Sequence, residues 1–180
     1  VVLSLNASLR LNDNKLKIPN LAVSEKSRNV ELQVKGEYSN AKDFNVDVKK
    51  LNIKSPLLDN ISGMFQTDKT LTQIIKNINR VDLQGYVRKH YSSLTAKANV
   101  KTYTGDILID AKRERDKTNV SIASSNLNIG KILSKEDLLG NTSFVAKANG
   151  VNIKDFASSI KFSNLTLKKY EYRNITAELE

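Results

Sequence analysis

Cysteine and tryptophan are absent from this 180-residue sequence, and histidine occurs once. Without cysteine the chain has no disulfide framework, no thiolate metal ligand and no cysteine nucleophile. Aromatic residues make up only 6% of the chain, which leaves few side chains for stacking on bases or sugars. A single histidine, His90, cannot supply a catalytic triad or a multi-histidine metal site alone, and we interpret it as a surface residue in a polar loop.

Several other signatures of chemistry are also missing. No run of about 18 apolar residues is present, so no helix is expected to span a bilayer. No glycine-rich phosphate loop, zinc spacing or calcium loop occurs. Asp106 and Asp110 would share one face of a strand, and we interpret them as solvated charges because nothing apolar surrounds them to raise a pKa. We therefore expect no enzymatic activity, no cofactor and no metal.

Basic residues are in excess, with a formal net charge of +10. Such a chain attracts phosphate, whether in nucleic acid or in anionic lipid headgroups. The lysines are nevertheless spread along the sequence, and the one dense cluster, Lys112–Lys117, is interrupted by two acids. This pattern favours a solvated outer face, and we do not expect a nucleic-acid partner.

Strict alternation of apolar and polar residues is what the sequence has in abundance. At the start of the chain, apolar residues from Leu3 to Leu11 alternate with polar ones, which is typical of a strand with one dry face. Residues 12–15 predict a tight turn, and Pro19 predicts a sheet edge or a bulge in the strand that follows. Short polar separators recur down the chain, so we predict an all-β antiparallel meander with short helices.

The same alternation assigns one set of side chains to the apolar side of the predicted strands. These residues are Leu3, Leu5, Leu9, Val30, Leu32, Val34, Val46, Val48, Leu83, Val87, Leu94, Ala96, Ala98, Val100, Ile107, Ile109, Val120, Ile122, Phe144, Ala146, Ala148 and Phe162.

Helix signals interrupt the strands. Ser55-Pro56 is typical of a helix start, and Leu71, Ile74, Ile75 and Ile78 form a helical stripe. Residues 134–137 predict the start of a short helical turn that ends before Gly140.

We therefore expect a single repeat-built β segment over 1–180. It has strands in 1–54, a helical insertion at 55–79, and strands in 80–180 with short helical turns near 130–139 and 154–159. The chain starts at Val1 inside an alternating pattern, which suggests a fragment of a longer protein.

A weak internal repeat supports this modular organisation. Leu51-Asn52-Ile53 and Leu127-Asn128-Ile129 lie 76 residues apart (127 − 51), and each follows a strand and precedes a helical segment. Residues 151–153 form a looser third copy. A recurring unit of strand, helix and strand is typical of an extended, modular β structure.

The segments Leu51–Leu58 and Leu127–Leu133 resemble the strand and short-helix unit of the AsmA-like superfamily. Val81–Val87, Leu94–Val100 and Asn141–Gly150 resemble the repeats of its TamB-type translocation and assembly module proteins, in their Bacteroidetes-like form. These patterns cover most of the chain. The resemblance implies a periplasmic part of an inner-membrane-anchored cell envelope protein in a Gram-negative cell. The membrane anchor is expected outside this fragment, which also lacks any recognisable partner-binding C-terminal end.

The resemblance also implies a sheet curled into a U-shaped, taco-like apolar groove lined by the residues named above. Its implied partners are phospholipid or acyl chains carried toward the outer membrane and, as a further role, outer-membrane β-barrel proteins under assembly. Aliphatic side chains suit acyl chains because burial contributes roughly 0.8 kcal/mol per methylene without catalytic geometry.

A second interpretation stays open, an extracellular adhesin or glycan-binding β-sandwich domain without catalytic activity. One-sided strands would also build two sheets that close on each other. The two interpretations differ in whether the apolar face is open or covered.

Overall fold

The computed structural model describes residues 2–27, 29–55, 57–58, 69–151 and 157–179. These residues form one 12-stranded sheet with two short helices, α2 (Lys69–Ile78) and α3 (Ile129–Leu133). The strands are β1 (Leu3–Asn12), β2 (Lys15–Glu25), β3 (Val30–Asn40), β4 (Asp43–Lys54), β5 (Arg80–His90), β6 (Ser93–Thr102), β7 (Gly105–Glu114), β8 (Lys117–Asn128), β9 (Leu139–Gly150), β10 (Ala157–Leu167), β11 (Tyr170–Tyr172) and β12 (Ile175–Leu179).

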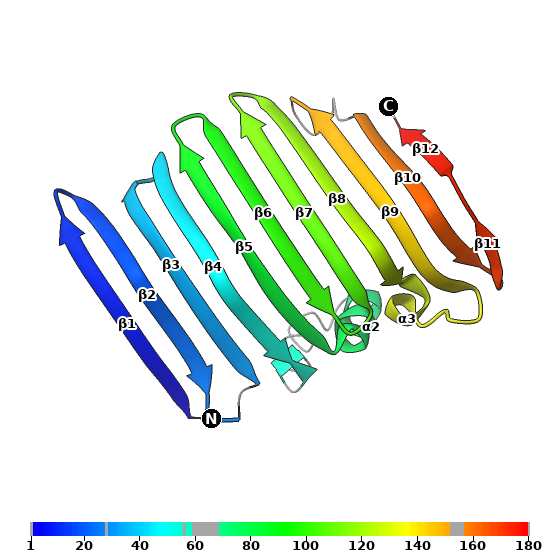
Figure 1. Cartoon of the computed structure of the whole chain (residues 1–180), viewed down its shortest axis with the longest axis horizontal. Coiled ribbons are helices and arrows are strands. Elements are labelled where there is room, and N and C mark those ends of the chain that lie inside the picture. The colour runs from blue at the N-terminus through cyan, green and yellow to red at the C-terminus, as the bar shows by residue number, and fades with distance from the viewer. Residues whose placement is uncertain (1, 28, 56, 59–68, 152–156, 180) are drawn as a thin grey trace.

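Neighbouring strands in the sheet follow the order of the chain from β1 to β11, and β12 pairs with β10 beside β11. Every pairing is antiparallel. Figure 1 shows the strands side by side across the molecule, with β1 at one edge, β11 and β12 at the other, and both helices at one end of the strands. The predicted fold class, an all-β antiparallel meander with short helices and a curled sheet, is confirmed, and the sheet is open.

Local backbone geometry follows the sequence signals at the first hairpin. Asp13 and Asn14 both have positive φ, at 46° and 61°, which matches the two-residue turn that twists with its flanking strands. Pro19 lies within β2, where the register with β3 shifts between Ile18 and Leu21. The predicted bulge is therefore present, and it places proline where a ladder donor is not required.

The helical prediction after β8 is wrong in its position. The helix begins at Ile129, directly after the strand, and Ser134 is its C-cap with a left-handed φ of 54° instead of its N-cap. The reason is Asn128, whose side chain accepts a hydrogen bond from the backbone N–H of Lys131 and so starts the helix earlier.

Two further expectations need correction. Of the helical turn predicted at 154–159, residues 154–156 lie outside the described residues, while 157–159 belong to β10 and pair with β9. Hydrogen bonds to the neighbouring strand stabilise the extended conformation there instead of a short helical turn. His90 is the last residue of β5 instead of a loop residue, because the hairpin that follows is closed by Tyr91 and Ser92 alone.

The internal repeat has a structural counterpart. In β4 the register with β5 shifts between Val48 and Leu51, and in β8 the register with β9 shifts between Ser124 and Leu127. Each bulge thus lies directly before the leucine of a Leu-Asn-Ile sequence, at the same distance from that leucine in both copies. Of the looser third copy, residues 152 and 153 lie outside the described residues.

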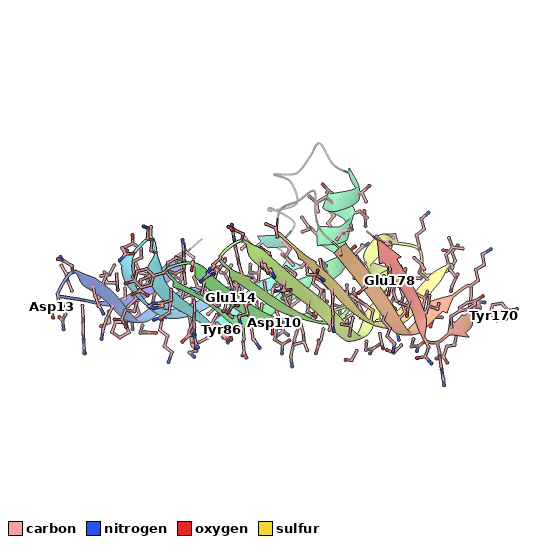
Figure 2. All side chains as sticks on the ribbon, turned by 90° about the horizontal axis from the view of Figure 1, so that it is seen from above. Asp13, Tyr86, Asp110, Glu114, Tyr170 and Glu178 are labelled. Atoms are coloured by element: carbon pink, nitrogen blue, oxygen red, sulfur yellow. The ribbon has the colours of Figure 1, made fainter. Side chains whose placement is uncertain are left out.

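The sheet is a single layer over most of its length. Among the described residues, only two apolar side chains, Leu58 and Leu127, are buried. Sheets with one apolar face are ordinarily stabilised by packing that face against another layer. Here α2 lies at one end of the strands in Figure 1 and stands off one side of the sheet in Figure 2, and the described residues leave most of the strand surface without a second layer.

Candidate functional site: the apolar face of the sheet

The register of the strands joins their apolar residues into one continuous row. Directly paired positions run from β1 to β10 and on to β12 without a polar side chain between them. The row, here called the central row, is Ala7, Leu21, Val34, Val48, Gly85, Ala98, Ile109, Ile122, Ala146, Ile160 and Ala177. Because side chains alternate in direction along a strand, neighbouring rows on the same face are two residues away, or three residues away across the bulges of β2 and β4.

Two such rows flank the central row. One consists of Leu5, Val23, Leu32, Leu51, Leu83, Val100 and Ile107. The other consists of Ile18, Gly36, Val46, Val87, Ala96, Ala111, Val120 and Ala148. Together the three rows make an apolar face, the feature on which the proposed function rests.

The register brings the sequence-predicted lining residues onto this one face. Leu94 pairs with Lys89, two positions beyond the row that contains Val87 and Ala96. Val30 pairs with Ile53, two positions beyond the row that contains Leu32 and Leu51. Leu9 lies at the register shift between Ser8 and Arg10, so its position on the face follows from alternation with its neighbours.

Sequence reasoning missed the apolar residues of β2. Leu16 and Ile18 alternate correctly, but the bulge at Pro19 shifts the phase, so that Leu21 and Val23 continue the face three residues after Ile18. The signal was present in the Pro19 bulge itself, since one inserted residue reverses which positions point to a given side.

Exposure varies along the apolar face. Every described side chain of β1 is exposed, with Leu5 at 69%, whereas the residues of β4 to β9 on this face are mostly half-buried by their neighbours. At the other edge the face contains a hollow of about 180 Å³ between β8 and β12, lined chiefly by Val120, Ile122, Ala146 and Ile160. The rings of Phe144 and Phe162 lie 6.1 Å apart beside it.

Near α3 the face is closed. Leu127 and Thr142 pair across β8 and β9, and they are only 6% and 1% exposed. The Thr142 hydroxyl donates a hydrogen bond to the backbone carbonyl of Asn164, at 2.9 Å. This end is therefore packed like a small core, while the rest of the face is accessible.

The opposite face of the sheet is polar. Lys97 and Asp110 form an ion pair at 2.8 Å across β6 and β7, and the hydrogen bond to Asp110 raises the pKa of Lys97. Arg88 stacks over the ring of Tyr86, at 4.3 Å from the ring centroid. Figure 2 labels Tyr86 of β5 and Asp110 of β7, and both are paired in register with Lys97 of β6, which lies between them on this face.

Asp106 and Asp110 lie on this polar face, on the side of β7 expected from the sequence. Asp110 forms an ion pair with Lys97, and Asp106 lies opposite Lys101 in the register of the two strands. Leu108, 54% exposed, is an apolar exception between them.

One carboxylate of the polar face is held in a tighter arrangement. Asp82 accepts hydrogen bonds from the side chains of Asn52 and Arg80, the latter at 2.6 Å. Burial raises the pKa of Asp82, but these hydrogen bonds and the charge of Arg80 outweigh it, so that the pKa lies below its ordinary value. Asn52 is itself buried, which ties the end of β4 to β5.

The one histidine, His90, lies beside an acidic residue at the surface of the sheet. His90 Nδ1 lies 3.2 Å from a carboxylate oxygen of Asp43 at an exposed hairpin end. Over the residues that the structure describes, no group of three or more histidine and acidic side chains could hold a metal ion. Within the same ranges, no helix has both the length and the apolar character needed to cross a bilayer.

Comparison with known proteins does not assign this chain. No family model, no curated protein and no solved structure matches it.

Proposed function

We propose that this chain is a segment of a periplasm-spanning envelope protein whose apolar face conducts phospholipid acyl chains toward the outer membrane. The observation that supports this proposal is the central row, which continues across eleven strands from Ala7 to Ala177. At about 4.8 Å between neighbouring strands, that row is roughly 48 Å long. Among the described residues, no second layer covers most of this row.

Such a face fits acyl chains in both chemistry and extent. Its side chains are aliphatic and small in the middle of the sheet, where Ala96 and Ala98 carry single methyl groups and Gly85 carries no side chain. Burial of an acyl chain contributes roughly 0.8 kcal/mol per methylene and requires continuity of apolar surface rather than directed hydrogen bonds. A chain can therefore shift along the row at little cost, as conduction requires.

A second role, assistance to outer-membrane proteins during assembly, is supported by the edge strand β1. Among the described residues β1 is paired only on its β2 side, and all ten of its residues are exposed. Arg10 is its one charged residue, so it has little of the protection that usually blunts a sheet edge. An extended client strand could pair with this edge by β-augmentation.

The adhesin or glycan-binding interpretation requires two sheets that close on each other. The described residues form one open sheet, so the geometry does not support that alternative.

The proposal is tested with a fluorescent fatty acid titrated into the purified chain. Ile109→Asp places a hydrated carboxylate in the central row. If this keeps about three methylenes away from the face, the loss is about 2.4 kcal/mol, or roughly sixtyfold in Kd. The matched control is Leu108→Asp, the adjacent residue of similar size on the polar face.

Weak binding by Ile109→Asp with normal binding by Leu108→Asp is the expected result. Circular dichroism spectra that match the parent chain show that both variants are folded. Equal affinity in the two variants, or no uptake by the parent chain, contradicts the acyl-chain proposal.

A further inference from the structure

Three segments that are distant in sequence meet at the helix-bearing end of the sheet. They are the turn between β6 and β7, the stretch from α3 to β9, and the turn between β10 and β11, all at the lower end in Figure 1. The Nζ atom of Lys131 lies 4.9 Å from the ring centroid of Tyr103. The backbone N–H of Lys168 donates to the carbonyl of Leu138 at 2.7 Å, which joins the third segment to the second.

These contacts make one surface, here called the basic end. It is defined by Tyr103, Lys131, Leu133, Leu138, Lys168 and Lys169. Its apolar members are open to solvent: Tyr103 is 66% exposed, Leu133 39% and Leu138 38%. Tyr170, which follows directly on Lys169, is 70% exposed. Aliphatic residues beside tyrosines are the combination that settles at the headgroup level of a bilayer, because tyrosine has an apolar ring and a polar tip.

The charge of this surface is positive. Lys131, Lys168 and Lys169 are joined there by Lys135, against the acids Glu136 and Asp137. Within the described part of the chain, none of these four lysines forms an ion pair with a carboxylate. Their charges are therefore available to a partner. Lysines also place the ammonium group in water while their aliphatic stems cover apolar surface.

We propose that the basic end binds the surface of an anionic phospholipid bilayer. Leucine and tyrosine would enter the headgroup region while the lysines contact lipid phosphates. Tyr103 could stack on a base as well as enter a headgroup region, but the exposed Leu133 and Leu138 beside it favour lipid over nucleic acid, because leucine has no aromatic ring to stack on bases. The surface lies where β6 to β10 reach one end of the sheet, beside the apolar face. The inference does not depend on the acyl-chain proposal and has its own test.

The test is co-sedimentation of the full chain with two kinds of vesicle, phosphatidylcholine alone and phosphatidylcholine mixed with phosphatidylglycerol. The informative variant is Lys168→Asn combined with Lys169→Gly. Both positions have positive φ, at 49° and 68°, and Asn-Gly is the preferred sequence for such a turn. The double variant thus removes two charges without disturbing the fold. The affinity for anionic vesicles should fall roughly thirtyfold, since each lysine near the surface contributes about 1 kcal/mol.

The matched control is Arg115→Asn combined with Lys117→Gln, at the opposite end of the strands. Arg115 also has a positive φ, of 53°, and the control likewise removes two positive charges. A second variant, Leu133→Ser with Leu138→Ser, should weaken vesicle binding while leaving the net charge unchanged.

Equal binding to both kinds of vesicle would overturn the proposal, as would losses of the same size in the control and in Lys168→Asn/Lys169→Gly. Ile109→Asp separates this inference from the acyl-chain function. It should impair fatty-acid uptake and leave vesicle binding intact.

Discussion

Replacing Leu127 by alanine removes one of the two apolar side chains that are buried in the described part of the chain, where it is 6% exposed. The change deletes three carbon atoms, which at about 0.8 kcal/mol each amounts to about 2.4 kcal/mol of lost transfer free energy. The cavity left behind adds to this, and buried Leu→Ala changes typically cost about 2–5 kcal/mol. A single-layer sheet can partly relax around the gap, so we expect about 3 kcal/mol.

That loss is large beside the total stability of an ordinary domain, about 5–15 kcal/mol. For a chain of this size it lowers Tm by roughly 6–12 °C. Urea unfolding followed by far-ultraviolet circular dichroism measures the change directly. The urea concentration at the midpoint should fall. The slope of the unfolding free energy against urea concentration should stay the same, because the surface exposed on unfolding is nearly unchanged.

The matched control is Leu5→Ala, the same chemical change at a residue of the same apolar face that is 69% exposed. It should cost less than about 0.5 kcal/mol, as surface substitutions ordinarily do. If Leu127→Ala and Leu5→Ala destabilise the chain equally, the end of the sheet near α3 is not a packed core, and the reasoning fails.

Three further predictions concern the contact between β4 and β5 at Asp82 and the start of α3. Because the folded-state pKa of Asp82 is depressed by its partners Asn52 and Arg80, its stabilising contribution is present above the unfolded pKa of about 3.9 and is lost as pH falls below it. Asp82→Asn should therefore show a smaller loss of stability between neutral pH and pH 3 than the parent chain, and identical pH profiles would contradict this. Asn128→Ala removes the N-cap of α3 and should cost about 1 kcal/mol in urea unfolding, whereas an unchanged midpoint would exclude the cap as a contributor. Gly130→Ala builds a methyl group that overlaps the carbonyl oxygen of Leu139, so α3 or β9 must move, at a cost of about 1–3 kcal/mol; a Tm equal to that of the parent would show that the contact is not tight.

Much of this fold is predictable from local sequence because the strands alternate strictly. From Leu3 to Leu11 a polar residue separates each apolar one, and the Asp13-Asn14 pair is suited to a two-residue turn. A strand that alternates has a defined dry side, and a short turn forces the next strand to be antiparallel. The lining residues of β3 to β9 could therefore be named in advance.

Bulges are where such prediction fails. At Pro19 the alternation changes phase within one strand, which concealed Leu21 and Val23. The start of α3 was misplaced because a serine can cap either end of a helix, and only the bond from Lys131 to Asn128 shows which cap operates. Residues 157–159 were misassigned because their pairing with β9 depends on contacts outside the local sequence.

The sequence by itself determined that this is a β protein whose strands have one apolar side, because period two sets the direction of each side chain. It also determined that cysteine chemistry is excluded. Only the tertiary structure decided that the apolar sides join into an unbroken row from Ala7 to Ala177 and that, in the described part of the chain, most of this row has no second layer over it. The physical reason is that an open sheet and a closed sandwich share the same alternation. Register and layer packing are set by contacts between strands distant in the chain, and so no single strand carries that information.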